Sequence, residues 1–306
     1  MQIGITGGAG FIGAALALRL QASGHTVYVM DAFTDYYDIE LKLERAQRLQ
    51  ANEIDVFDGN VHEELGTWCE IHTFDALFHL AALPGVPGSL TEPHRYIEDD
   101  IAMTVTVLET ARTHRIPHVF FASSSSVYGE QTGALLEQQA TGNVMSPYAA
   151  AKYSAETFCR TYHNLYDMNV TIFRFFTVYG PSGRPDMALF RFIEQALDGQ
   201  PLTVFGDPVR DFTYIDDITR GMEQALEVKA TGIFNLGANR PESVRDIAGM
   251  LSERFNVPVR SAPARTGDVS TTWSNTDAAR QTFGYVPSFT LADGIERMIR
   301  WHLERR

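Results

Sequence analysis

A tyrosine and a lysine stand four residues apart in the segment from Tyr148 to Lys152. On a helix this spacing puts both side chains on one face, where an ammonium beside a phenol stabilises the ionised phenolate. Such a pair could act as a general base. The spacing is also common on surface helices, so it gains weight only from its surroundings. Ser124 belongs to a run of four serines that ends an apolar segment and brings hydroxyl groups suited to holding a reacting oxygen.

A glycine-rich turn near the start of the chain gives the Tyr148–Lys152 pair a functional context. Gly7, Gly10 and Gly13 lie between an apolar strand-like run and a helix expected from Ala14 to Ala22. Gly7 would permit a tight turn, Gly10 would let the backbone approach a pyrophosphate, and Gly13 would let helix and strand pack closely. The helix N-terminus would offer N–H groups to the anion. The alternative is a glycine-rich loop without a ligand, but the position of the turn favours a dinucleotide site.

The ends of two further strands suggest which dinucleotide binds. Asp31 ends the second strand, where a carboxylate accepts hydrogen bonds from ribose hydroxyls and repels a 2′-phosphate, so NAD is favoured over NADP. Asp31 could instead cap the following turn. The strand end at Leu80, Ala81 and Ala82 brings small residues to a place where a flat cofactor could lie against the backbone. His79 is expected to be a core residue.

Alternation of apolar runs with longer helical patterns predicts the α/β class, with a doubly wound parallel sheet of the Rossmann type. Two long helices, expected near Tyr96 to His114 and Tyr148 to Asp167, should lie side by side on one sheet face. The expected strands are Gln2 to Thr6, Thr26 to Met30, Ile54 to Phe57, Ala76 to Leu80, His118 to Ala122 and Val170 to Phe175.

The pattern changes after about Pro181 to shorter elements, which predict a smaller C-terminal α/β substrate lobe. We therefore expect a cofactor-binding domain over 1–180, with contributions from about 207–238, and a substrate-binding domain mainly over 181–306. The elements expected there are Leu202 to Phe205, Ile233 to Leu236, Val244 to Phe255 and Leu291 to His302.

Composition excludes several classes of partner. The formal net charge of −13 disfavours nucleic acid and anionic membranes, and no apolar run approaches the roughly 18 residues of a membrane helix. The two cysteines, Cys69 and Cys159, have no metal-ligand spacing and fit a reduced, cytoplasmic protein. Asp211 and the pair Asp216-Asp217 are interpreted as structural, so no metal is expected.

These motifs together resemble the extended short-chain dehydrogenase/reductase family, whose members carry a Gly-x-x-Gly-x-x-Gly turn, an active-site Ser or Thr, and Tyr-x-x-x-Lys. The resemblance implies that Tyr148 is the base, that Lys152 stabilises its phenolate and holds the nicotinamide ribose, and that Ser124 hydrogen-bonds the reacting oxygen. It implies sugar contacts for Ser125 and Ser126, which stand where dehydratases have an Asp-Glu pair, so a 4,6-dehydratase is disfavoured. Further cofactor contacts implied are Phe11, Ile12, Asn60, Val61 and Phe175.

Three segments, over 35–42, 174–188 and 210–217, resemble the UDP-glucuronate 4-epimerase branch of that family. By this resemblance Arg184 would bind the sugar carboxylate, unless it is an ordinary solvated arginine of its Pro/Gly-rich loop. A guanidinium is suited to carboxylate and phosphate oxygens. Arg210 and Arg265 would contact the diphosphate and Asp268 the uridine ribose. Other implied substrate contacts are Thr177, Ala188 and Val204.

The implied activity is interconversion of UDP-glucuronate and UDP-galacturonate through a transient 4-keto sugar, with bound NAD. The alternatives are UDP-glucuronate decarboxylase, UDP-glucose 4-epimerase and, from another class, a dinucleotide-binding sensor without catalysis. The resemblance also implies a homodimer joined through the two long helices.

The chain departs from the branch pattern at positions that bear on substrate choice. Pro87 and Gly88 replace a cation and an aromatic ring near the expected sugar pocket. Asp100 stands where an Asn is usual, Asn60 where an acidic residue often contacts adenine, and Ser182 where Trp is frequent.

Overall fold

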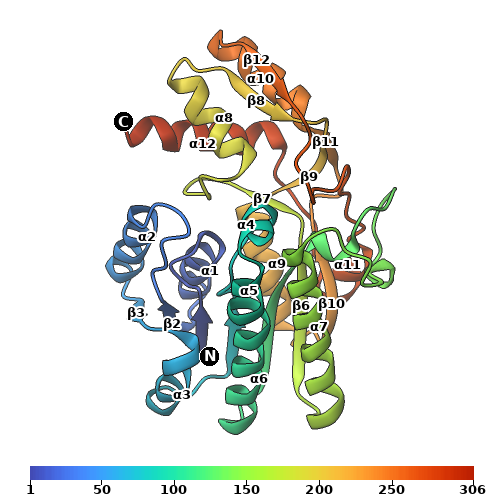
Figure 1. Cartoon of the computed structure of the whole chain (residues 1–306). Helices are drawn as coiled ribbons and strands as arrows, with labels where there is room; N and C mark the ends of the chain where they lie inside the picture. The colour runs from blue at the N-terminus through green and yellow to red at the C-terminus, as the bar shows by residue number, and fades with distance from the viewer.

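The computed structural model describes all 306 residues and has a seven-stranded parallel sheet at its centre (Figure 1). The strand order is β10-β6-β5-β4-β1-β2-β3, and the order reverses between β1 and β4. This confirms the doubly wound α/β fold. The strands are β1 (Gln2–Thr6), β2 (Thr26–Asp31), β3 (Asp55–Asp58), β4 (Ala76–His79), β5 (His118–Ser124), β6 (Asn169–Phe175) and β10 (Gly232–Leu236).

Helices cover both faces of the sheet, which is why its strands are apolar on both sides. Phe120 and Phe121 of β5 point into two separate apolar cores, one on each face. One face carries α3 (Val61–Ile71), α6 (Met103–Thr113) and α7 (Pro147–Tyr166). The other carries α1 (Phe11–Ala22), α2 (Glu40–Ala51), α9 (Ile215–Glu227) and α11 (Asp277–Phe283).

A smaller lobe lies beyond the carboxyl ends of the strands, at the top of Figure 1. It contains a parallel pair of strands and three helices, and a three-stranded sheet of order β11-β9-β7 leads into it. The short strands of the three-stranded sheet were not expected from the sequence pattern. The elements are β7 (Thr177–Tyr179), α8 (Ala188–Leu197), β8 (Leu202–Phe205), β9 (Val209–Tyr214), β11 (Pro241–Ser243), α10 (Val244–Phe255), β12 (Val259–Ala262) and α12 (Leu291–Glu304).

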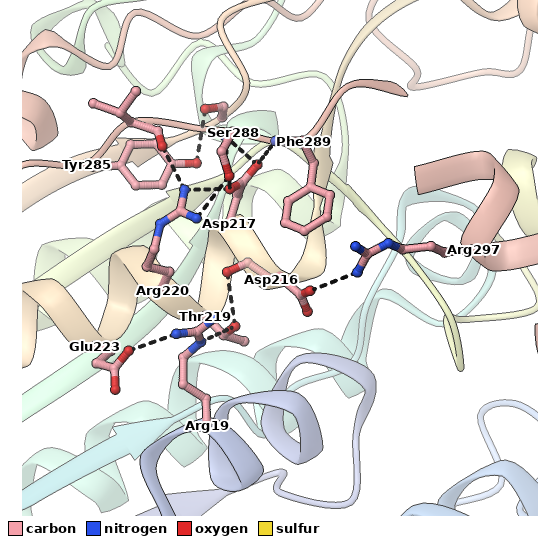
Figure 2. A network of polar contacts seen from close by, with 12 residues as sticks. Arg19, Asp216, Asp217, Thr219, Arg220, Glu223, Tyr285, Ser288, Phe289 and Arg297 are labelled. Carbon is pink, nitrogen blue, oxygen red and sulfur yellow. Dashed lines mark hydrogen bonds and ion pairs between the residues drawn. The ribbon is translucent and has the colours of Figure 1, made fainter. Parts of the chain in front are cut away.

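Helix α9 ties the two lobes together (Figure 2). Asp217 accepts hydrogen bonds from the backbone N–H groups of Ser288 and Phe289, each at 3.0 Å. On the opposite side of the helix, Arg19 of α1 donates to Glu223 at 2.9 Å. Asp217 therefore holds the loop before α12 and does not cap its own helix. No group of three His, Cys, Asp or Glu side chains is placed to hold a metal ion.

The first long helix expected from the sequence is interrupted. Two short helices, α4 (Val86–Thr91) and α5 (Pro93–Tyr96), precede a π-helical turn over Ile97–Ala102, here called the π-turn, and only then does α6 begin. Helix α1 begins at Phe11, three residues earlier than expected, because Gly10 already has the extended backbone of an N-cap residue.

Both cysteines are buried and unpaired. Burial raises the pKa of the Cys69 thiol to about 12, so it is unreactive in the folded protein. None of the helices is long and apolar enough to cross a membrane.

Candidate active site

A cavity of about 420 Å³ opens at the carboxyl ends of the strands, between the two lobes. It follows the rule that ligands of doubly wound sheets bind where the strand order reverses. Every residue predicted as catalytic or cofactor-binding lines it. These are Gly7, Gly10, Phe11, Ile12, Gly13, Asp31, Asn60, Val61, Leu80, Ala81, Ala82, Ser124, Tyr148, Lys152 and Phe175.

The glycine turn leaves no room for side chains. A Cβ atom on Gly7, whose φ is +71°, would lie 2.5 Å from the backbone nitrogen of Ala81, and one on Gly13 would clash with the Gly7 carbonyl oxygen. Gly10 begins α1 as its N-cap residue. Backbone can therefore approach a ligand closely at a helix N-terminus, as a dinucleotide pyrophosphate requires. These residues fit NAD.

Asp31 both supports the turn and faces the cavity. Its carboxylate accepts from the backbone N–H of Ala9 at 3.0 Å and of Phe33 at 2.9 Å. The Lys42 ammonium lies 3.4 Å from the same carboxylate and also lines the cavity. Asp31 therefore supports the turn and also lines the cavity, while its contact with the ribose hydroxyls stays a prediction. Lys42 had no predicted role, although it lies in the segment over 35–42 that resembles the epimerase branch.

Tyr148 and Lys152 lie on the first two turns of α7. Ser146 caps this helix by accepting from the Ala149 N–H at 3.2 Å, and a proline suited to the first helical position follows it. The Lys152 side chain is buried, with its ammonium 5.3 Å from the centre of the Phe121 ring. The helix thus presents the expected base and its cation to the cavity from one face.

The serine run turns sharply where β5 ends. Ser124 closes the strand, and its hydroxyl accepts from the Ser126 N–H and donates to the Ser126 hydroxyl, both at 3.2 Å. Residues 125–128 continue as a 3₁₀ turn. Ser125 and Ser126 also line the cavity, so the three hydroxyls stand at its wall.

A buried ion pair holds α7 against the sheet beneath this site. Arg174 of β6 donates to both carboxylate oxygens of Glu156 at 2.9 and 2.6 Å, and both side chains are 3% exposed. Ser123 donates to the same carboxylate at 2.5 Å, and Arg174 also donates to the carbonyl oxygen of Glu137. Glu156 was not predicted from the sequence, where its only signal is its place one turn after Lys152.

The predicted substrate residues divide into two groups. Thr177, Arg184, Arg210 and Asp268 line the cavity together with the serines. Arg184 pairs in two places with Asp186, with Nε–Oδ1 at 3.0 Å and Nη2–Oδ2 at 2.5 Å. This leaves other donors of its guanidinium free for a ligand.

Three further predicted substrate residues lie outside the cavity wall. Val204 is buried in β8, and Ala188 starts α8 in a smaller neighbouring pocket. The Arg265 guanidinium stacks on the Phe205 ring at 4.1 Å. Their roles stay predictions.

Tyrosine side chains occupy the region of the Pro87-Gly88 departure. A Cβ atom on Gly88 would lie 2.8 Å from the hydroxyl oxygen of Tyr96 and 3.5 Å from the Tyr36 ring. Tyr96 donates from there to the carbonyl oxygen of Gly85 at 3.1 Å, and Tyr36 lines the cavity. The space that a larger residue at Gly88 would need is therefore filled by two phenols.

Comparison with known proteins agrees with this geometry. The model of the NAD dependent epimerase/dehydratase family matches residues 3–237. A UDP-glucuronate 4-epimerase 2 of Arabidopsis thaliana is 37% identical, over 98% of this chain and 75% of that protein. A UDP-glucuronate 4-epimerase of Thermodesulfobacterium geofontis is 35% identical over 98% and 95%. The crystal structure of the UDP-glucuronic acid 4-epimerase of Bacillus cereus, in complex with UDP-glucuronic acid and NAD, superposes with a TM-score of 0.94 at 34% identity over the whole of both chains. The resemblance inferred from the sequence is confirmed: this chain belongs to the NAD dependent epimerase/dehydratase family.

Proposed function

We propose that this protein is a UDP-glucuronate 4-epimerase that interconverts UDP-glucuronate and UDP-galacturonate with a retained NAD. The observation that carries the proposal is the common cavity. Its wall contains Ser124, Tyr148 and Lys152 together with Arg184. The relatives described above are named UDP-glucuronate 4-epimerases. The structure of the Bacillus cereus enzyme contains UDP-glucuronic acid and NAD.

The bound NAD would supply reversible hydride acceptance at carbon 4 of the sugar. Tyr148 takes the proton of the C4 hydroxyl, while Lys152 stabilises the resulting charge and Ser124 hydrogen-bonds the reacting oxygen. The 4-keto sugar then turns over about its diphosphate linkage. Tyr148 gives the proton back to the C4 oxygen, and because the hydride would return to the opposite face of the ketone, C4 would be inverted without net oxidation.

The carboxylate of the substrate needs restraint, because a 4-keto hexuronate is a β-keto acid and can lose CO₂. Arg184 is a cation of the cavity wall that could hold it, since the Asp186 pair orients the guanidinium and leaves donors free. The remaining cavity residues assigned above, including Arg210 and Asp268, would hold the diphosphate and the ribose.

Replacing this cation tests its role. Arg184→Met is expected to lower kcat/KM for UDP-glucuronate by roughly 10- to 100-fold, because a charged hydrogen bond contributes about 1.5–3 kcal/mol. Any turnover of UDP-glucose should change far less, since that sugar has no carboxylate. Steady-state kinetics on both sugars measures the ratio. The matched control is Arg245→Met, an exposed arginine of α10 paired with Asp207. An equal loss on both sugars would contradict the assignment.

Product analysis tests the activity itself. The purified protein, given UDP-glucuronate without added cofactor and then with NAD⁺, is expected to form UDP-galacturonate, identified by chromatography and proton NMR. Release of CO₂ with a UDP-pentose would make it a decarboxylase. Inversion of UDP-glucose alone would make it a UDP-glucose 4-epimerase, and cofactor binding without turnover of either sugar would favour the sensor.

We also infer a homodimer joined through α6 and α7. The α7 helix carries Phe158, Leu165 and Tyr166 at its surface, which are large apolar side chains exposed to solvent in the single chain. The free thiols fit a reducing, cytoplasmic setting.

A further inference from the structure

One buried carboxylate differs from all the others in the molecule. Asp100 lies on the π-turn with its side chain fully buried, and neither carboxylate oxygen has a hydrogen-bond partner. By contrast, Asp31, Asp217 and Glu156 each accept several hydrogen bonds. Burial raises the pKa of this carboxyl, so it keeps its charge only beside a compensating cation.

That partner is the catalytic lysine. The Asp100 Oδ1 atom lies 3.3 Å from Nζ of Lys152, and the two side chains are 0% and 5% exposed. The π-turn fixes this approach, because Thr104 of α6 donates to the Asp100 carbonyl oxygen at 2.6 Å. Helical turns of this kind are frequent at functional sites. Asp100 does not line the cavity, so it can act on the substrate only through Lys152.

His79 of β4, which lies near Lys152, and Tyr96 of α5, which lies near Asp100, carry no charge. Burial lowers the pKa of His79 to about 3, and its ring contacts the hydroxyls of Thr6 and Thr104, so it stays neutral. Burial also raises the pKa of Tyr96, which stays a phenol. Neither residue can neutralise the Asp100 carboxylate.

The other charges near the pair have partners of their own. Asp99, the next acid on the π-turn, lies 3.8 Å from Arg95. Glu156 on the same helix as Lys152 is neutralised by Arg174. Arg184 is the cation on the cavity side of Tyr148, and it pairs with Asp186. The only ion pair of Asp100 is therefore the one with Lys152.

We propose that Asp100 is a positioning residue that holds the Lys152 ammonium and offsets part of its charge, which gives Tyr148 a higher proton affinity than the uncharged Asn usual at this position would give it. This inference deepens the proposed function and rests on Tyr148 as the base of a 4-epimerase. Such an enzyme uses one tyrosine as base in one half of the reaction and as acid in the other. An uncompensated ammonium favours the phenolate, so the charge of Asp100 shifts the balance of Tyr148 toward the half of the reaction in which it acts as the acid.

Asp100→Asn removes the charge and keeps the shape. In ultraviolet titration of tyrosinate absorbance, with D100N/Y148F subtracted to isolate Tyr148, the midpoint is expected to fall by about one pH unit relative to the same difference for the wild type. The acid limb of kcat/KM for UDP-glucuronate should fall with it. Both shifts should persist at high salt, because buried charges are weakly screened.

The matched control is Glu98→Gln, which removes an exposed carboxylate from the same π-turn. Its midpoint is expected within about 0.2 pH unit of the wild type, because exposed charges are screened. Should D100N be unstable by thermal melting, Asp100→Ser must move the midpoint in the same direction. An unchanged or raised midpoint in a folded neutral variant overturns the proposal. The absorbance titration decides this without substrate, so failure of the epimerase assignment would be seen separately.

Discussion

Tyr148→Phe is expected to lower kcat for inversion of UDP-glucuronate by about 10²- to 10⁴-fold, which is the usual contribution of a positioned acid-base group. The ring that contacts Tyr96 edge-on at 6.1 Å is retained, so the cavity wall should keep its shape. Only the proton acceptor and donor is lost. Proton NMR of the nucleotide products over hours gives the residual rate, and the cofactor content of the purified variant reports whether the site still forms.

A neighbouring phenol provides the control for this change. Tyr153 lies on the same helix, and its hydroxyl reaches the carbonyl oxygen of Ala140 at 3.5 Å, outside the cavity lining. Tyr153→Phe should leave kcat within about twofold of the wild type, since it removes only a hydroxyl with a long hydrogen bond, away from the cavity, and keeps the packed ring. A Tyr148→Phe variant within tenfold of wild-type activity would show that another group moves the proton.

Arg174→Met is expected to lower the free energy of unfolding by about 3–5 kcal/mol, because it leaves Glu156 as an uncompensated buried charge. Both Arg174 and Glu156 are buried, and their side chains make the four hydrogen bonds described above, which supports this estimate. Urea denaturation followed by circular dichroism measures the change. Since α7 carries the catalytic residues, activity should fall with the loss of stability.

Two further variants separate charge from packing. The double variant R174M/E156L should recover much of the loss, because well-packed apolar residues can replace a buried ion pair. Arg280→Met removes an exposed partner of Asp277 and should change the free energy of unfolding by less than about 1 kcal/mol. A single variant R174M as stable as the wild type would show that the pair does not hold α7 to the sheet.

The sheet was predictable because its strands are short, continuous apolar runs between turn residues. The first strand, Gln2–Thr6, and the strand Leu202–Phe205 have the expected bounds, and the others differ by one or two residues. The glycine turn and the Tyr148–Lys152 spacing were predictable for a related reason. Their function depends on local backbone geometry, and residues that are adjacent in the sequence determine that geometry.

The π-turn and the buried ion pairs of Glu156 and Asp100 were not predictable. The residues over 97–102 continue a helical pattern, and nothing in their order signals one extra residue per turn. Glu156 and Asp100 find their partners across tertiary contacts that sequence spacing does not encode. The positions of Val204 and Arg265 likewise depend on how the smaller lobe folds over the larger one.

The late arrival of the edge strand has a consequence for synthesis of the protein. Strand β10, over Gly232–Leu236, pairs with β6, over Asn169–Phe175, after the chain has passed through half of the smaller lobe. When only residues 1–180 of a nascent chain have emerged from the ribosome, the edge of β6 that pairs with β10 therefore has free backbone N–H and C=O groups beside apolar side chains. Such edges invite association with other chains. Aggregation is thus a hazard of this protein until its edge strand emerges, and the first 180 residues alone should not behave as an independent folding unit.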